Sequence, residues 1–95
     1  MPRIYQTPVM GEAHIRAAIV HSESEADILV YRASSWGMAH GEAYWFITRN
    51  KQDADVWMFF TDQGFAQLKV YFVETRGQAQ WNKPHRLRGK LRGRF

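Results

Sequence analysis

Short apolar segments alternate with short polar connections along most of this chain. The segments are rich in Val, Ile, Tyr, Phe and Trp, which are the residues typical of β-strands. Six strands are predicted, at Ile4–Tyr5, Ile15–Val20, Ile28–Ala33, Tyr44–Thr48, Val56–Thr61 and Leu68–Val73. The run from Val56 to Phe60 shows no polar alternation, which predicts a strand that is covered on both faces.

The segments belong to an internal repeat, marked by an Ala that precedes a polar residue. These alanines lie 13, 13, 15, 12 and 13 residues apart, in the pairs Ala13-His14, Ala26-Asp27, Ala39-His40, Ala54-Asp55, Ala66-Gln67 and Ala79-Gln80. The connections are too short for a helical crossover, which needs about 10–12 residues, but each Ala-centred end has room for one helical turn. We therefore expect a mainly β protein with short helical turns, a single compact domain over residues 1–95 built from about six 13-residue strand-plus-turn repeats. Strands this apolar with connections this short must wrap around one another, and the periodicity leaves their topology open.

Composition narrows the class of protein. A chain of 95 residues with 45% hydrophobic and 15% aromatic residues predicts one folded domain. The absence of cysteine excludes disulfides, cysteine-ligated metals and thiol catalysis. No apolar run approaches the roughly 20 residues that span a membrane, and the first residues do not form a secretory signal, so a cytoplasmic location is expected. Burial of Val56–Phe60 is equally compatible with a monomer core and a homodimer interface.

Three stretches of the repeat resemble a known family. They are Leu68-Lys-Val-Tyr-Phe-Val-Glu-Thr-Arg-Gly-Gln-Ala-Gln-Trp81, Ser35-Trp-Gly-Met-Ala-His-Gly-Glu-Ala-Tyr-Trp-Phe-Ile-Thr48 and the ending Trp81-x-x-x-His85-Arg-Leu-Arg-Gly89. Together they resemble the septoil-knot family of small bacterial proteins, from about Arg3 to Arg92. The resemblance implies a single domain with a backbone tied in a deep seven-crossing, or 7(1), knot, and it implies no catalytic residues. Ala17-Ala18 departs from the pattern, since other repeats place an aromatic residue second, and this predicts thinner packing there.

Charge is concentrated at the end of the chain. Residues 1–80 hold seven Lys and Arg against nine Asp and Glu, whereas residues 81–95 hold six basic residues and no acid. The basic C-terminal segment, residues 83–95, is therefore a candidate arm for RNA, DNA or another polyanion, flexible at its end. It could equally serve solubility or dock on the acidic body. The candidate contacts are Lys83, Arg86, Arg88, Lys90, Arg92 and Arg94.

The longest interval of the repeat is a candidate functional loop. It holds His40 and Glu42 and follows Trp36, with two glycines between Trp36 and Glu42. His40 and Glu42, joined by His85, are a possible acid–base or metal-binding set, but a glycine turn with local hydrogen bonds favours a structural reading. Trp36 and Trp81 lie outside the predicted strands and are therefore the rings we expect to be exposed.

A metal site is a further hypothesis, because His14 and His40 occupy the same repeat position as Asp27 and Asp55. Gln67 and Gln80 at that position favour a structural role instead, and we expect no metal, no cofactor and no catalytic residues. The preferred interpretation is a non-enzymatic protein of high kinetic stability, with a structural or protein-interaction role. Polyanion binding is the alternative, and an enzyme using His40, Glu42 and His85 is the third.

Overall fold

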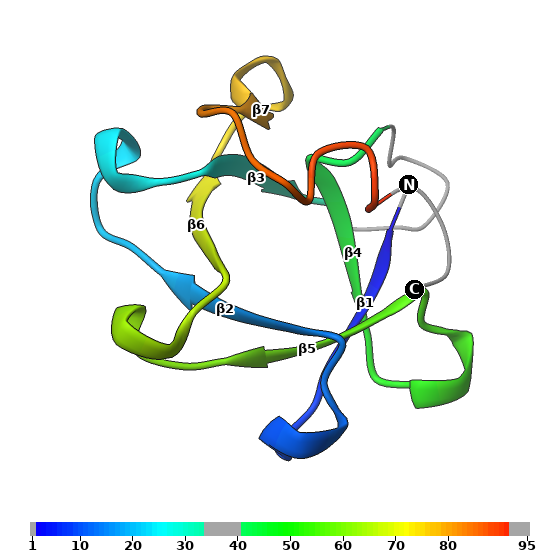
Figure 1. The fold of residues 1–95 in the computed structure, drawn as a ribbon. Helices are drawn as coiled ribbons and strands as arrows, with labels where there is room; N and C mark the ends of the chain where they lie inside the picture. Colours follow the sequence, from blue (N-terminus) through cyan, green and yellow to red (C-terminus); the bar gives the residue numbers. More distant parts are fainter. Residues whose placement is uncertain (1, 34–40, 92–95) are drawn as a thin grey trace.

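Six short strands close into a barrel in the computed structural model, which describes residues 2–33 and 41–91 (Figure 1). The barrel strands are β1 (Arg3–Gln6), β2 (Ile15–Ile19), β3 (Ile28–Arg32), β4 (Tyr44–Thr48), β5 (Val56–Phe60) and β6 (Leu68–Val73). All of their pairings are parallel, and β7 (Gln80–Trp81) adds to β3 in the antiparallel sense. The structure confirms the mainly β, single-domain repeat fold and matches the six predicted strands closely.

The chain passes around the barrel twice. The strand order is β4-β1-β5-β2-β6-β3, and β3 pairs with β4 to close the ring. Strands of the second pass, β5 and β6, therefore lie between those of the first. This interleaving explains how connections of about seven residues suffice, because those from β1 to β2, β2 to β3, β4 to β5 and β5 to β6 each step over a single intervening strand, whereas β3 and β4 are direct neighbours. The knot that the resemblance implies stays a prediction.

Most of the connections contain one turn of 3-10 helix on the outside of the barrel. The described turns are η1 (Met10–Glu12), η2 (Glu23–Glu25), η4 (Lys51–Asp53), η5 (Gln63–Phe65) and η6 (Arg76–Gln78). Each of them ends at the repeated alanine, whose backbone is already extended and leads into the next strand. Among the described residues these turns are the only helices, and none could cross a membrane.

The inward side chains of the six strands form three layers. Neighbouring strands are staggered by two residues, and side chains alternate between the two faces of each strand, so each strand sends every second residue inward. The layer at the N-terminal ends of the strands comprises Pro2, Ile15, Ile28, Ala43, Val56 and Leu68. The middle layer comprises Ile4, Ala17, Val30, Trp45, Met58 and Val70, and both layers are buried. The third layer, at the C-terminal ends, comprises Gln6, Ile19, Arg32, Ile47, Phe60 and Phe72.

The unusual Ala17 has a packing reason. In the strand order, β2 lies directly across the barrel from β4, so Ala17 faces Trp45, the largest residue of the middle layer. Trp45 is fully buried, and its ring lies 6.2 Å from that of Phe72 on β6, which shows that it extends across the barrel. The Trp45 side chain therefore fills the space that the small Ala17 leaves, where the sequence predicted thinner packing. On the outside of β5, Trp57 and Phe59 are half-buried, so the strand is less covered there than its sequence predicted.

Candidate functional site

In four of the repeats, the polar residue after the repeated alanine clasps a neighbouring strand through two hydrogen bonds. Its backbone N–H donates to a carbonyl on that strand, and its side chain accepts a hydrogen bond from the N–H of the same partner residue. The side-chain bonds are 2.9–3.0 Å long, and the pairs are His14 with Trp57, Asp27 with Lys69, Asp55 with Arg3 and Gln67 with Arg16. An acceptor atom is all this role requires, which explains why His, Asp and Gln share the position.

These clasps bear directly on the metal hypothesis. The acceptor atoms of His14, Asp27 and Asp55 point at backbone N–H groups rather than at one another. Among the described residues, no group of three or more His, Asp or Glu side chains is placed to hold a metal ion. His40 lies outside the described residues.

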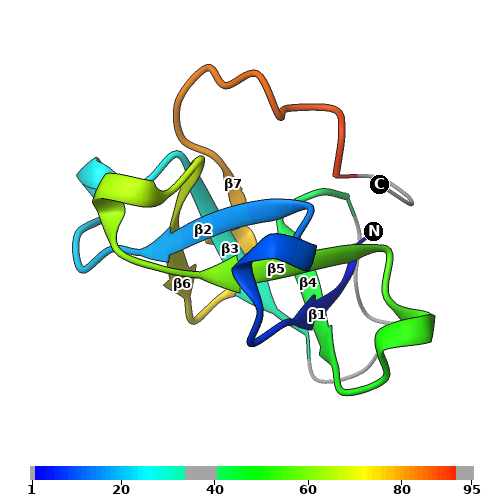
Figure 2. The same ribbon diagram turned by 60° about the horizontal axis from the view of Figure 1, so that its bottom comes forward.

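Residues 83–91 of the basic C-terminal segment lie over one end of the barrel (Figure 2). Residues 83–91, which we call the tail plug, bring Leu87 and Leu91 against the buried core. Leu91 is 0% exposed, comparable with the strand residues of the core. As far as residue 91, the segment is thus part of the fold.

Glu42 anchors the tail plug. The residue is 8% exposed, and its carboxylate accepts three hydrogen bonds. Oε1 accepts from Gly89 N at 2.8 Å and from Trp81 Nε1 at 3.0 Å, and Oε2 accepts from Leu91 N at 2.8 Å. Gly89 has φ of +89°, a conformation that favours glycine, and this turn brings both tail N–H groups to one carboxylate. The Glu42 that the sequence marked as functional therefore serves to hold the tail.

Trp81 and His85 extend this anchor. The Trp81 ring is half-buried in β7 and stacks on His85 with centroids 5.7 Å apart, so the expectation of an exposed Trp81 was wrong. His85 Nδ1 accepts from Leu87 N at 3.1 Å, which places the proton of the neutral ring on Nε2. Nε2 lies 2.9 Å from the Gln67 carbonyl oxygen and 3.6 Å from Asp27 Oδ2. Both nitrogens of His85 are therefore engaged in holding the tail.

Four cations of the segment lie on its outer side. Lys83, Arg86, Arg88 and Lys90 are exposed, while His85 and Leu87 between them are half-buried. Within the described chain, none of the four forms an ion pair. The remaining candidates, Trp36, His40, Arg92 and Arg94, lie outside the described residues.

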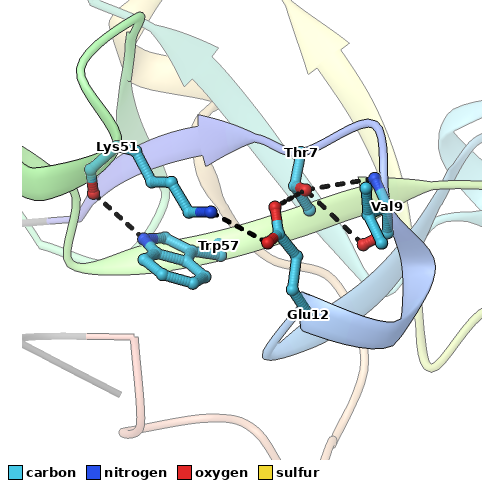
Figure 3. A network of polar contacts seen from close by, with 5 residues as sticks. All are labelled: Thr7, Val9, Glu12, Lys51 and Trp57. Atoms are coloured by element: carbon cyan, nitrogen blue, oxygen red, sulfur yellow. Dashed lines mark hydrogen bonds and ion pairs between the residues drawn. The ribbon is translucent and has the colours of Figure 1, made fainter.

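A separate polar network joins the first repeat to the fourth (Figure 3). Glu12 accepts from the Thr7 hydroxyl and pairs with Lys51 Nζ at 2.8 Å, and the Lys51 ammonium lies 4.4 Å from the centre of the Trp57 ring. The hydrogen bonds from Lys51 and Thr7 lower the pKa of Glu12. The network is half-exposed and ties two connections together.

The opposite end of the barrel holds a pocket that the sequence reasoning missed. It has a volume of about 110 Å³ and is lined by the six residues of the third layer, one from each strand: Gln6, Ile19, Arg32, Ile47, Phe60 and Phe72. We call this set the barrel mouth. Ile19 is 49% exposed there, and the Arg32 guanidinium lies 5.5 Å from the centre of the Phe72 ring. The signal was present in the repeat, because these residues follow the middle layer by two positions in every unit.

A polar hollow of about 280 Å³ also lies beside η2, β6 and η6. Glu23, Glu74, Thr75 and Gln78 contribute to its lining. It is a shallow depression between exposed connections, and no buried polar group points into it.

Comparison with known proteins agrees with the barrel. The family model of the 7(1) septoil knot domain matches residues 1–82, which leaves the basic segment 83–95 outside the matched region. No curated protein and no solved structure matches the chain. The match covers most of the sequence and all six barrel strands, so the chain belongs to the 7(1) septoil knot domain family.

Proposed function

We propose that this protein is non-enzymatic and that it acts as a kinetically stable frame with a structural or protein-interaction role. The observation that carries the proposal is the use made of its polar side chains. Glu42, His85 and Asp27, which sequence reasoning considered for chemistry, direct their acceptor or donor atoms at the backbone of the fold. They hold strands and tail together, which supports a role in stability rather than in a reaction.

The barrel also has features that slow unfolding. Each second-pass strand lies between two first-pass strands, so no strand of that pass leaves without breaking two ladders. The tail plug then closes one end over the core. Contacts between residues far apart in the chain make such a topology slow to form. Stabilising contacts that are absent from the transition state, such as those we expect of the tail plug, slow its unfolding.

Unfolding kinetics test this proposal. We expect the full chain to unfold in concentrated urea with a rate, extrapolated to water, slower than about 10⁻⁵ s⁻¹, and to resist a nonspecific protease over hours. An ordinary rate of about 10⁻² s⁻¹ or faster, with rapid two-state refolding, would contradict it. We also propose a cytoplasmic location. Sedimentation will distinguish the monomer from the homodimer.

Polyanion binding is the second candidate, and the anchoring of the tail plug favours it. Because Leu91 and Leu87 fix the segment, the cations between and beside them are held at the surface in a defined arrangement. A pre-ordered set of cations loses less entropy when it binds phosphates than a flexible arm does.

A salt titration with single-stranded RNA tests this second function. We expect binding at low salt, and we expect the triple variant Arg86→Gln/Arg88→Gln/Lys90→Gln to lower the slope of log K against log salt by about 2, since each lost phosphate contact removes about 0.7. Arg49→Gln, an exposed cation after β4, is the matched control and should leave the slope unchanged. No binding by the unaltered chain at low salt, or an equal effect of the control, would remove the polyanion function.

A further inference from the structure

The two ends of the barrel differ in what covers them. At the N-terminal ends of the strands, Leu87 and Leu91 of the tail plug complete the core. At the C-terminal ends, the barrel mouth is a half-open pocket with apolar walls. The C-terminal ends of parallel strands are where ligands bind in many α/β folds, because the strands there present side chains around one opening.

The polar residues of the barrel mouth lie on one side of it. In the strand order, Arg32 on β3 and Gln6 on β1 flank Ile47 on β4. Phe60, Ile19 and Phe72, on the next three strands, form a continuous apolar arc opposite. A ligand in this pocket therefore meets two hydrogen-bond donors on one side and hydrocarbon on the other.

The charge of the barrel mouth, which comes from Arg32, favours an anionic ligand. In the described part of the chain no carboxylate pairs with Arg32, whose recorded contact is with the Phe72 ring. A guanidinium offers a fork of N–H donors that matches a carboxylate, and the Gln6 amide adds a further donor. The third layer contains no acid, so an anion is favoured over a cation.

The volume of the barrel mouth limits the size of the ligand's hydrocarbon part. A cavity of about 150 Å³ in another protein holds benzene, so the 110 Å³ of the barrel mouth suits a branched group of four or five carbons, or a phenyl ring that is partly exposed at the opening. We propose that the barrel mouth binds a small free monocarboxylic acid with a branched aliphatic or phenyl group. The carboxylate lies between Arg32 and Gln6, and the hydrocarbon lies against Ile19, Phe60 and Phe72. This site is at the opposite end from the tail plug and goes beyond the functions proposed above.

Titration of the full ¹⁵N-labelled chain with phenylacetate, followed by amide shifts in NMR spectra at pH 7, tests the proposal. We expect a dissociation constant of about 1 mM, in keeping with a ligand of this size. The shifts should concentrate at the C-terminal ends of the strands. Phenylacetamide, which has the same shape without the charge, should bind at least tenfold more weakly, and isovalerate should bind at the same residues.

Variants locate the site and separate it from general anion binding. Arg32→Gln should remove the preference for the acid over the amide, whereas Arg49→Gln, the matched exposed arginine, should keep it. Ile19→Glu places a carboxylate at the rim beside Phe72 and should abolish binding, and thermal unfolding will show that both variants remain folded. The proposal is overturned if Arg32→Gln retains the preference, if inorganic phosphate produces the same shifts with equal affinity, or if no acid binds up to 50-fold above the expected constant. It is also overturned if a peptide such as acetyl-Gly-Gly-Leu binds at the mouth while the free acids do not.

Discussion

The most direct test of the tail plug is Glu42→Gln. The substitution keeps the shape of the side chain but turns one acceptor oxygen into an amino group that donates. In the better orientation the amide oxygen keeps the bonds from Gly89 N and Trp81 Nε1, and the amino group then faces the Leu91 N–H. The other orientation loses two bonds instead of one. Every orientation therefore leaves at least one donor facing another donor.

The magnitude follows from these contacts. A buried N–H left without an acceptor costs about 1–3 kcal/mol, and two hydrogen bonds that lose their charge weaken by roughly 0.5–1 kcal/mol each. Removing the charge from this buried residue relieves part of the desolvation cost of the carboxylate, which offsets some of this loss. We expect a net loss of about 2 kcal/mol in the free energy with which the tail holds to the barrel.

Two measurements are needed because the tail can detach while the barrel stays folded. Equilibrium urea unfolding gives the loss of global stability, and hydrogen exchange at the Gly89 and Leu91 amides gives the release of the tail. A loss of 2 kcal/mol corresponds to about thirtyfold faster exchange at these two amides. Glu74→Gln, an exposed carboxylate after β6, is the control and should change neither quantity. The reasoning fails if Glu42→Gln changes stability by less than about 0.5 kcal/mol and leaves both amides protected.

Three further predictions concern the barrel. Asp27→Asn keeps an acceptor for the clasp and should cost less than about 1 kcal/mol in urea unfolding, whereas Asp27→Ala removes it and should cost about 1–3 kcal/mol. Ala17→Val should lower the free energy of unfolding by about 1–3 kcal/mol because it overpacks the core against Trp45, and adding Trp45→Phe should relieve part of that loss. If the effects of the two substitutions add within about 0.5 kcal/mol in a double-mutant cycle, the contact between the two residues across the barrel is contradicted. The pKa of Glu12 is lower in the folded state than in the unfolded state. Its contribution to stability is therefore present above the unfolded pKa and is lost as the pH falls through the folded pKa. The difference in the free energy of unfolding between the unaltered chain and Glu12→Gln should shrink toward acid pH and stay constant near neutrality.

Local features of the fold followed from the sequence, and long-range features did not. The six strands were predictable because each is a short apolar segment between polar connections, and the length of the connections left room for one helical turn, which the five described turns confirm. The strand order was not predictable from the sequence. β1 pairs with β4 and β5 rather than with β2, and the period of the repeat is the same whichever strands are paired. The short strand β7 was missed because a strand of two residues, Gln80 and Trp81, is too short to show an apolar segment.

The candidate site shows the same division. The longest interval of the repeat drew attention to Glu42 as a candidate for chemistry, but its three hydrogen-bond donors come from residues 39 to 49 positions further along, which no local pattern specifies. The docking of the basic segment had a signal that its charge obscured. Leu87 and Leu91 are one helical turn apart among six cations, and apolar residues in an otherwise basic segment indicate a packed face.

Departures from the repeat are informative only where packing does not explain them. Ala17 departs from the pattern, and the size of Trp45 across the barrel accounts for it. Arg32 and Gln6 also depart, because the other inward residues of the three layers are apolar. The fold does not require either one, since apolar side chains would extend the core and the tail plug shows that this barrel can close an end with leucine. Both side chains are exposed at the open end of the barrel, where water can solvate them. Their place on one side of an otherwise apolar layer is what a ligand with a carboxylate and a hydrocarbon part would match.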